Sequence, residues 1–250
     1  GMLSSDNVQV GFYQLASKLK GVCWSVINAI VGVLVPRLSY YAKHSIGQYR
    51  GLVQSGFGIV CNLCLGLCLY LIVEARSLTI WVSTGKYLDA VMAVRLIGLV
   101  SLFSCMSTFF ASCILTPLDR EGRLAIANMA GVPISLIGNL LLDARLGATG
   151  AALSMLVAEI IIFAMQVRYS WDVLCKSISI RRLIRMLGCH VCAVTSLVLV
   201  CVSMLAEQYA AQVVIGMVVY GTVWLICGLL LHEETVTWLC GLIRDKSPKK

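Results

Sequence analysis

The feature that most constrains this chain is a series of seven long apolar stretches, which fill most of the region between residues 9 and 232. Each stretch has about 20 residues or more, the length that a helix needs to cross the roughly 30 Å hydrocarbon core of a bilayer. Charged residues make up only 13% of the chain, whereas soluble domains carry roughly 25%. Backbone polar groups find no water in lipid, so each stretch must satisfy them internally as a helix. The sequence therefore predicts an all-α, polytopic transmembrane helical bundle.

The apolar stretches divide the chain into five parts. We expect spans at roughly 9–36, 52–73, 90–115, 122–142, 148–168, 187–206 and 209–232. These give an outer segment at 1–8, a five-span core at 9–168, a cytoplasmic interfacial helix at 169–186, two further spans at 187–232 and an amphipathic cytoplasmic tail at 233–250. A second helix at headgroup level is expected from Arg37 to Arg50, where tyrosines alternate with cations. Pro36 is expected to end the first span.

Loop charges predict the orientation of the spans. Alternate loops are rich in basic residues: Arg37, Lys43 and Arg50; Arg120 and Arg123; Arg168, Lys176, Arg181, Arg182 and Arg185; and Arg244, Lys246, Lys249 and Lys250. Basic residues are retained on the cytoplasmic side of a membrane. We therefore expect an outside N-terminus and a cytoplasmic C-terminus. The net charge of +8 then reflects topology and anionic lipid headgroups, and we expect no nucleic-acid partner.

The twelve cysteines predict neither a disulfide framework nor a metal centre. Most of them lie inside the apolar stretches, where cysteine behaves as a small apolar residue. Cys61, Cys64 and Cys68 share one helix face, but no fourth ligand for a tetrahedral site is evident. No Ser/His/Asp set, carboxylate pair or phosphate-binding glycine loop is apparent either. We expect no metal, no cofactor and no enzymatic activity.

Charged residues inside the spans are the main functional candidates, because a charge at membrane depth is costly. Glu159 lies near the middle of the fifth span. It could couple transport to a proton or cation, or bond another helix structurally. Lys18 and Lys20 lie within the first span, where they either reach the outer headgroups or line a polar cavity. Arg95, near the outer end of the third span, is either interfacial or points inward toward an anion.

A second set of residues is expected to shape helix packing or gating. Pro133 falls inside the fourth span and should kink it or open its hydrogen-bond ladder. Gly147 and Gly150 permit a tight outer reversal and close helix contact. Asn139 is expected to form a hydrogen bond between helices.

Five segments, in order, resemble the Wzx-type O-antigen and exopolysaccharide flippases of the multidrug/oligosaccharidyl-lipid/polysaccharide exporter superfamily. The segments are VGFYQLASKL at 10–19, VLVPRLS at 33–39, GKYLDAVMAVRLIG at 85–98, LTPLDREGR at 115–123 and LGATGAALSMLVAEI at 146–160. The resemblance covers about residues 2–170. Family members have two helix bundles around a central cavity. The resemblance therefore implies that this chain is the C-terminal half of a MATE-like inverted-V transporter, with 1–8 following a missing span.

The resemblance also implies a function and partners. The expected activity is flipping of an undecaprenyl-diphosphate-linked oligosaccharide across the bacterial inner membrane for O-antigen, capsule or exopolysaccharide synthesis. Lys18, Lys20 and Arg95 are then candidate substrate contacts, and Glu159 is the candidate coupling residue. Expected partners are the lipid-linked substrate, the bilayer, the missing N-terminal half or a second copy, and polysaccharide polymerase and chain-length proteins. The alternatives are a fragment of a MATE-like drug/cation antiporter and a membrane-embedded enzyme of the polysaccharide pathway.

Overall fold

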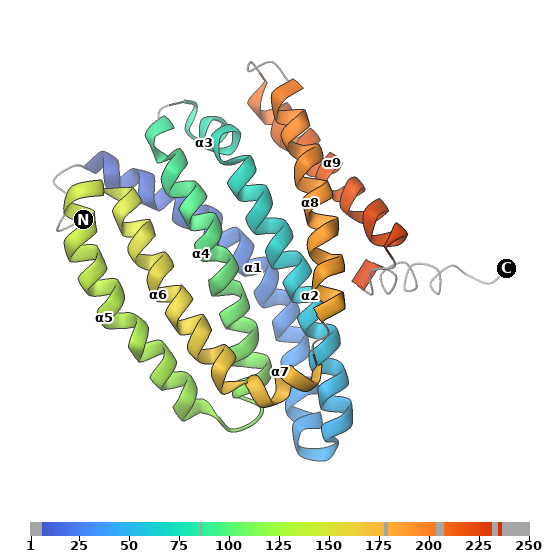
Figure 1. Cartoon of the computed structure of the whole chain (residues 1–250). Coiled ribbons are helices and arrows are strands. Elements are labelled where there is room, and N and C mark those ends of the chain that lie inside the picture. Colours follow the sequence, from blue (N-terminus) through green and yellow to red (C-terminus); the bar gives the residue numbers. More distant parts are fainter. Residues whose placement is uncertain (1–6, 86, 178–179, 204–207, 232–234, 237–250) are drawn as a thin grey trace. The chain divides into compact units, whose positions relative to one another are not determined.

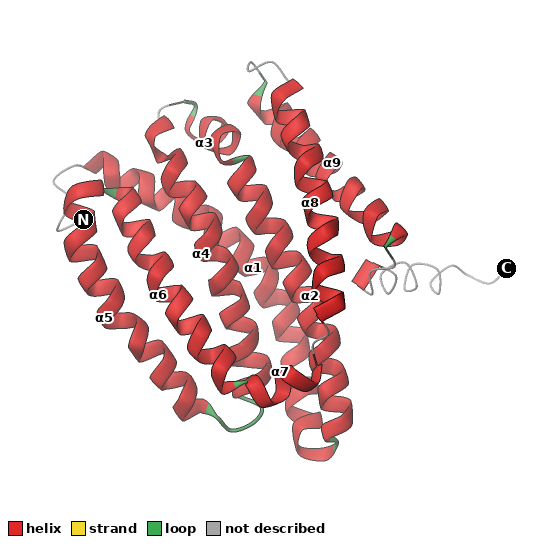
Figure 2. Ribbon diagram, viewed as in Figure 1, coloured by secondary structure: helices red, strands yellow, loops and turns green. Residues whose placement is uncertain are grey.

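The computed structural model describes residues 7–85, 87–177, 180–203, 208–231 and 235–236. All regular secondary structure within these residues is helical (Figure 2). Seven helices in the described part of the chain are long and apolar enough to cross a membrane. The prediction of an all-α, multi-pass membrane protein is therefore confirmed at this level. The long helices are α1 (Asn7–His44), α2 (Ile46–Val73), α4 (Val91–Phe109, preceded by the turn η1, Leu88–Ala90), α5 (Glu121–Leu146), α6 (Ala148–Tyr169), α8 (Ile180–Ser203) and α9 (Tyr209–Leu230).

The helix predicted at headgroup level between Arg37 and Arg50 is not a separate element. Helix α1 continues through Pro36 to His44, and only Ser45 separates it from α2. The prediction that Pro36 ends the first span is also wrong. A proline removes one backbone hydrogen bond, which a helix of 38 residues can lose without ending. The polar residues after Pro36 thus extend the span as a helix.

The interfacial helix predicted between 169 and 186 is also placed differently. Part of it forms the short helix α7 (Trp171–Ser177), while Arg181, Arg182 and Arg185 belong to the first turns of the long helix α8. Helix α8 therefore starts seven residues before the predicted boundary of 187. The predicted tail at 233–250 lies outside the described residues except for Thr235 and Val236, and residues 1–6 of the predicted outer segment also lie outside them.

Two further helical elements were not predicted, one after the second expected span and one inside the third. Helix α3 (Ala75–Ser83) follows α2 directly. The C-terminal end of α4 continues into a π-helical turn, η2 (Phe110–Leu115). The hydroxyl of Tyr49 donates a hydrogen bond to the Cys113 carbonyl in this turn at 3.2 Å. Turns of this kind occur mostly inside α-helices and often near functional sites.

The chain forms two compact units, Gly1–Ser177 and Ile178–Lys250. In the first unit, α4 packs against α1, α2 and α6, and α5 packs along α6 (Figure 1). The core of this unit includes Ala16 of α1, Val94, Ile97 and Val100 of α4, and Ala152 of α6. Helix α6 thus lies between the centre of the unit and its outermost long helix, α5.

The second unit is built on a pair of helices, α8 and α9, which pack along each other. His190 of α8 is buried and its Nδ1 atom is hydrogen-bonded to the Tyr220 hydroxyl of α9 at 2.8 Å. The His190 ring also stacks near Trp224. The sequence suggests an interfacial His190, because the span is expected to begin at 187. The earlier start of α8 places it well inside the helix.

Candidate intramembrane polar site

An ion pair joins the helices of the first and fifth predicted spans. The Nζ atom of Lys20 on α1 lies 3.3 Å from Oε1 of Glu159 on α6. The two side chains are only 15% and 16% exposed. A carboxylate inside a span is protonated, paired or turned toward a water-filled cavity. Glu159 is paired, and it also lines a cavity.

The helical period of α1 explains why Lys20, and not Lys18, makes this contact. Ala16, Cys23 and Ile27 are buried, and Lys20 lies four residues after the first and three before the second. Residues at these spacings share one helix face, so Lys20 projects from the packed face of α1. Lys18 lies two residues earlier on another face and is exposed. The same two helices also meet where the Tyr13 hydroxyl contacts the Met155 sulfur at 3.4 Å.

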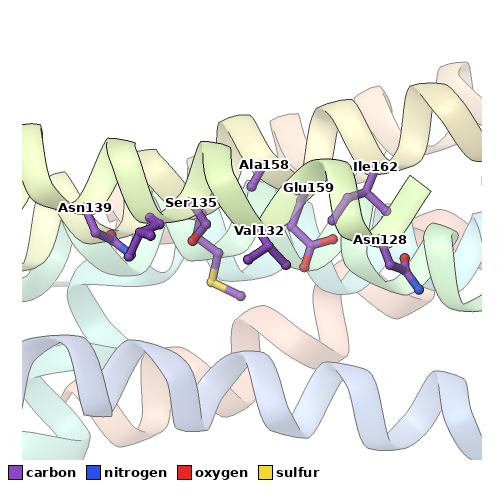
Figure 3. Close-up of a pocket in the computed structure, with 10 residues that line it drawn as sticks. Asn128, Val132, Ser135, Asn139, Ala158, Glu159 and Ile162 are labelled. Carbon is purple, nitrogen blue, oxygen red and sulfur yellow. The ribbon is translucent and has the colours of Figure 1, made fainter. Parts of the chain in front are cut away.

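A cavity of about 420 Å³ runs along α5 and α6 beside the ion pair. Figure 3 shows its labelled side chains, with Asn128, Val132, Ser135 and Asn139 on α5 and Glu159 on α6. The four α5 residues are spaced by four, three and four positions, which places them on one helix face. Its described lining is Asn128, Gly131, Val132, Ser135, Leu136, Asn139, Met155, Ala158, Glu159 and Ile162.

The amide groups of this cavity are only partly satisfied. The Asn139 Oδ1 atom is buried and has no hydrogen-bond partner. The expected interhelical hydrogen bond through this oxygen is therefore not formed, and Asn139 lines the cavity instead. At the other end, Gln166 Nε2 of α6 donates to Asn128 Oδ1 at 3.5 Å, the limit for such a bond. The Gln166 Oε1 atom is also buried without a partner.

The structure does not gather the three cations expected to bind substrate. Lys18 and Arg95 are exposed on α1 and α4, and in the described part of the chain neither takes part in the ion pair at Glu159. Lys20 is the member of the set that reaches the cavity residue Glu159. The sequence could not distinguish these three positions, because each is a cation within or near a span.

The predicted packing residues lie on the hairpin that carries the cavity. Gly147 joins α5 to α6 with a positive φ of +55°. The Gln9 side chain accepts a hydrogen bond from the Ala148 backbone N–H at 3.1 Å beside this turn. Gly150 packs so closely on the Leu142 carbonyl that an added Cβ would overlap it. Pro133 lies inside α5 on an exposed face.

A second ion pair, outside the spans, was not predicted. Arg120, just before α5, donates to both carboxylate oxygens of Asp172 on α7, at 2.7 and 2.6 Å. It also donates to the Tyr169 carbonyl at the end of α6 at 2.9 Å. These hydrogen bonds to the guanidinium lower the pKa of Asp172, and the carboxylate raises the pKa of Arg120. In the sequence, Arg120 only signals topology, because nothing links it to a residue 52 positions away.

The arrangement can hold a polar or charged group inside the membrane, next to a cation, a carboxylate and free amide oxygens. Such groups at membrane depth usually mark a substrate or ion pathway. The chain matches no family model, no curated protein and no solved structure.

Proposed function

We propose that this chain is one bundle of a transporter that flips an undecaprenyl-diphosphate-linked oligosaccharide across the bacterial inner membrane. The observation that carries the proposal is the Lys20–Glu159 ion pair at membrane depth, beside a polar cavity. The resemblance of five segments to polysaccharide flippases supports the same activity. Carrying a diphosphate and a glycan through hydrocarbon is costly, and a polar, water-filled path lowers that cost while the polyprenyl tail stays in lipid.

In this proposal, Lys20 exchanges one anionic partner for another. In the structure its ammonium group is held by Glu159. When substrate enters, the diphosphate replaces the carboxylate beside Lys20, and Glu159 is released to bind a proton or cation. Lys18 and Arg95, both exposed, act as approach contacts. Substrate binding then breaks the ion pair that holds α6 to α1, and the two helices become free to move relative to each other.

The complete pathway needs a second bundle. Flippases of the resembling family build their cavity between two halves, and alternating access comes from one repeat moving against the other. We therefore propose a MATE-like inverted V, in which this chain pairs with an N-terminal half or with a second copy. Its N-terminus lies outside and its C-terminus in the cytoplasm, as the alternation of basic loops predicts.

The test is a flipping assay on the protein purified from its native membrane with any chain that remains bound. Proteoliposomes would carry a fluorescent polyprenyl-diphosphate oligosaccharide, and dithionite would report the fraction in the outer leaflet. We expect faster exchange than in protein-free liposomes, and loss of this gain in Lys20→Met. Lys43→Met, at the exposed end of α1, is the matched control and should keep the gain. Exchange at the protein-free rate would contradict the proposal.

A drug/cation antiporter is the second candidate, because a carboxylate lines the cavity. Two observations weigh against it. Lys20 neutralises this carboxylate, and the described residues lining the cavity include no aromatic ring, the group that best recognises organic cations. The same proteoliposomes would distinguish the two, because an antiporter would move ethidium against a proton gradient and leave the lipid-linked glycan where it is.

A further inference from the structure

We propose that the cavity alongside α5 and α6 is a subsite for the sugar hydroxyls of the transported glycan, separate from the diphosphate contact at Lys20. This rests on the proposed function. It assigns Asn128 and Asn139 to substrate recognition. The expectation from sequence for Asn139 is helix packing or gating.

The cavity has the volume of a small-molecule site. Its volume of about 420 Å³ lies within the range of about 300–1,000 Å³ that such sites occupy. Polar side chains of α5 and the carboxylate of Glu159 on α6 are among the groups that line it (Figure 3). Apolar side chains, including Val132, Leu136 and Ile162, complete the lining. A sugar ring, with hydroxyls at its edge and C–H groups on its faces, matches this mixture.

One amide oxygen of the lining is not satisfied by helix packing. Asn139 Oδ1 is buried without a hydrogen-bond partner and Asn139 lines the cavity. An amide that is buried without a partner destabilises a protein, so a structural role does not explain Asn139. A ligand that donates hydroxyl hydrogens into the cavity would satisfy this oxygen. The Asn139 amide nitrogen can in turn donate to hydroxyl oxygens.

The charge of the lining favours a neutral hydroxylated group over a phosphate. Among the described residues that line the cavity, Glu159 carries the only charge, and it is negative. That carboxylate is paired with Lys20, and the described lining holds no cation that could bind a diphosphate, whereas a sugar hydroxyl can donate to the second oxygen of Glu159. Lys20 contacts Glu159 at 3.3 Å but is not part of the described lining. In this proposal, the glycan binds the polar side chains of the cavity, and the diphosphate binds the neighbouring ammonium group of Lys20.

The test begins with a cysteine placed in the cavity. Ser135→Cys would be labelled with a membrane-impermeant maleimide, with the unmodified chain giving the background of its native cysteines. Ile137→Cys is the matched control, because Ile137 lies on an exposed face of α5 outside the cavity lining. Three probes are compared: the cell's own oligosaccharide released from its carrier by mild acid, inorganic pyrophosphate and tetraphenylphosphonium.

We expect the free oligosaccharide to slow labelling of Ser135→Cys about tenfold at a concentration about ten times its Kd, by simple occupancy. Pyrophosphate and tetraphenylphosphonium should leave the rate unchanged, and Ile137→Cys should respond to none of the three. Protection by tetraphenylphosphonium alone would make this a cation site and overturn the proposal. Absence of labelling, or absence of protection by the sugar, would also overturn it.

Asn139→Leu, made in the Ser135→Cys background, separates recognition from structure. Because it removes an unpaired amide oxygen from the membrane, we expect it to keep or raise the melting temperature of the solubilised protein while abolishing protection by the sugar. A structural Asn139 would instead lower the melting temperature, and protection that persisted would place the sugar elsewhere. Flipping is measured separately, so protection without flipping would refute the proposed function and leave the subsite standing. Flipping without protection would refute the subsite alone.

Discussion

The two ion pairs of the first unit differ in geometry, and the difference follows their surroundings. Arg120 and Asp172, outside the spans, form a two-pronged pair at 2.7 and 2.6 Å, with side chains 25% and 58% exposed. Lys20 and Glu159, within the spans, share a single contact of 3.3 Å and are far less exposed.

This difference indicates different tasks. The Arg120 pair also reaches the Tyr169 carbonyl, so it fastens the start of α5 to the junction of α6 and α7. A guanidinium fork suits this because its planar geometry matches the carboxylate. The Lys20 pair leaves donors on the ammonium group and an acceptor on the carboxylate unused by each other. An ion pair that is costly to bury and that leaves hydrogen-bonding groups unused is expected at a site where a ligand replaces one of the two partners. The Lys20–Glu159 pair has both properties.

Breaking the intramembrane pair should have the largest effect. Lys20→Met leaves Glu159 without its cation, and removing one partner of a buried pair costs about 3–5 kcal/mol. The double variant Lys20→Met/Glu159→Gln should recover most of this loss, because no buried charge remains, but it should not recover flipping. The measurement is the midpoint of thermal unfolding of the solubilised protein. Single and double variants of equal stability would show that the pair is not buried in the membrane.

Moving one helix of the intramembrane pair should have an intermediate effect. Gly150→Ala places a methyl group against the Leu142 carbonyl, and overpacking of this kind costs about 1–3 kcal/mol. It shifts α6, which carries Glu159, relative to α5. The control is Gly122→Ala, where an added Cβ meets nothing within 4 Å. Equal unfolding midpoints for the two variants would contradict the close contact.

Breaking the exposed pair should have the smallest effect. Asp172→Asn or Arg120→Gln should cost about 0.2–1 kcal/mol, the range for exposed pairs, and less in high salt. Because the pKa of Asp172 is lowered in the folded protein, the pair stabilises the fold above the unfolded pKa of about 3.9. That stabilisation is lost as the pH falls through the lowered pKa. Unfolding midpoints measured with and without salt at pH 7 and at pH 2–4 would check it, and a salt-independent effect at pH 7 would contradict it.

The sequence predicted the long helices and the depth of Glu159 because apolar length and the cost of buried charge are local properties. It could not predict where helices end when a polar segment keeps its helical form, as α1 does beyond Pro36. It also could not identify partners, because the Lys20–Glu159 and Arg120–Asp172 pairs join residues 139 and 52 positions apart. The spacing of Asn128, Ser135 and Asn139 in the sequence predicts a polar face on α5. That this face lines a cavity becomes visible only when α6 is placed beside it.

The glycines between α5 and α6 bear on how such a transporter moves. Besides Gly150, Gly131 meets Ile162 and Gly138 meets Ser154 so closely that an added Cβ would overlap each neighbour. Two helices in such contact along their length cannot change their spacing without losing that packing. In the proposed transporter, we therefore expect α5 and α6 to move as one rigid body against α4 and α1, the helices on which α6 packs. The Lys20–Glu159 contact joins α6 to α1 across this boundary, so in the proposed cycle it would hold the resting position until substrate replaces it.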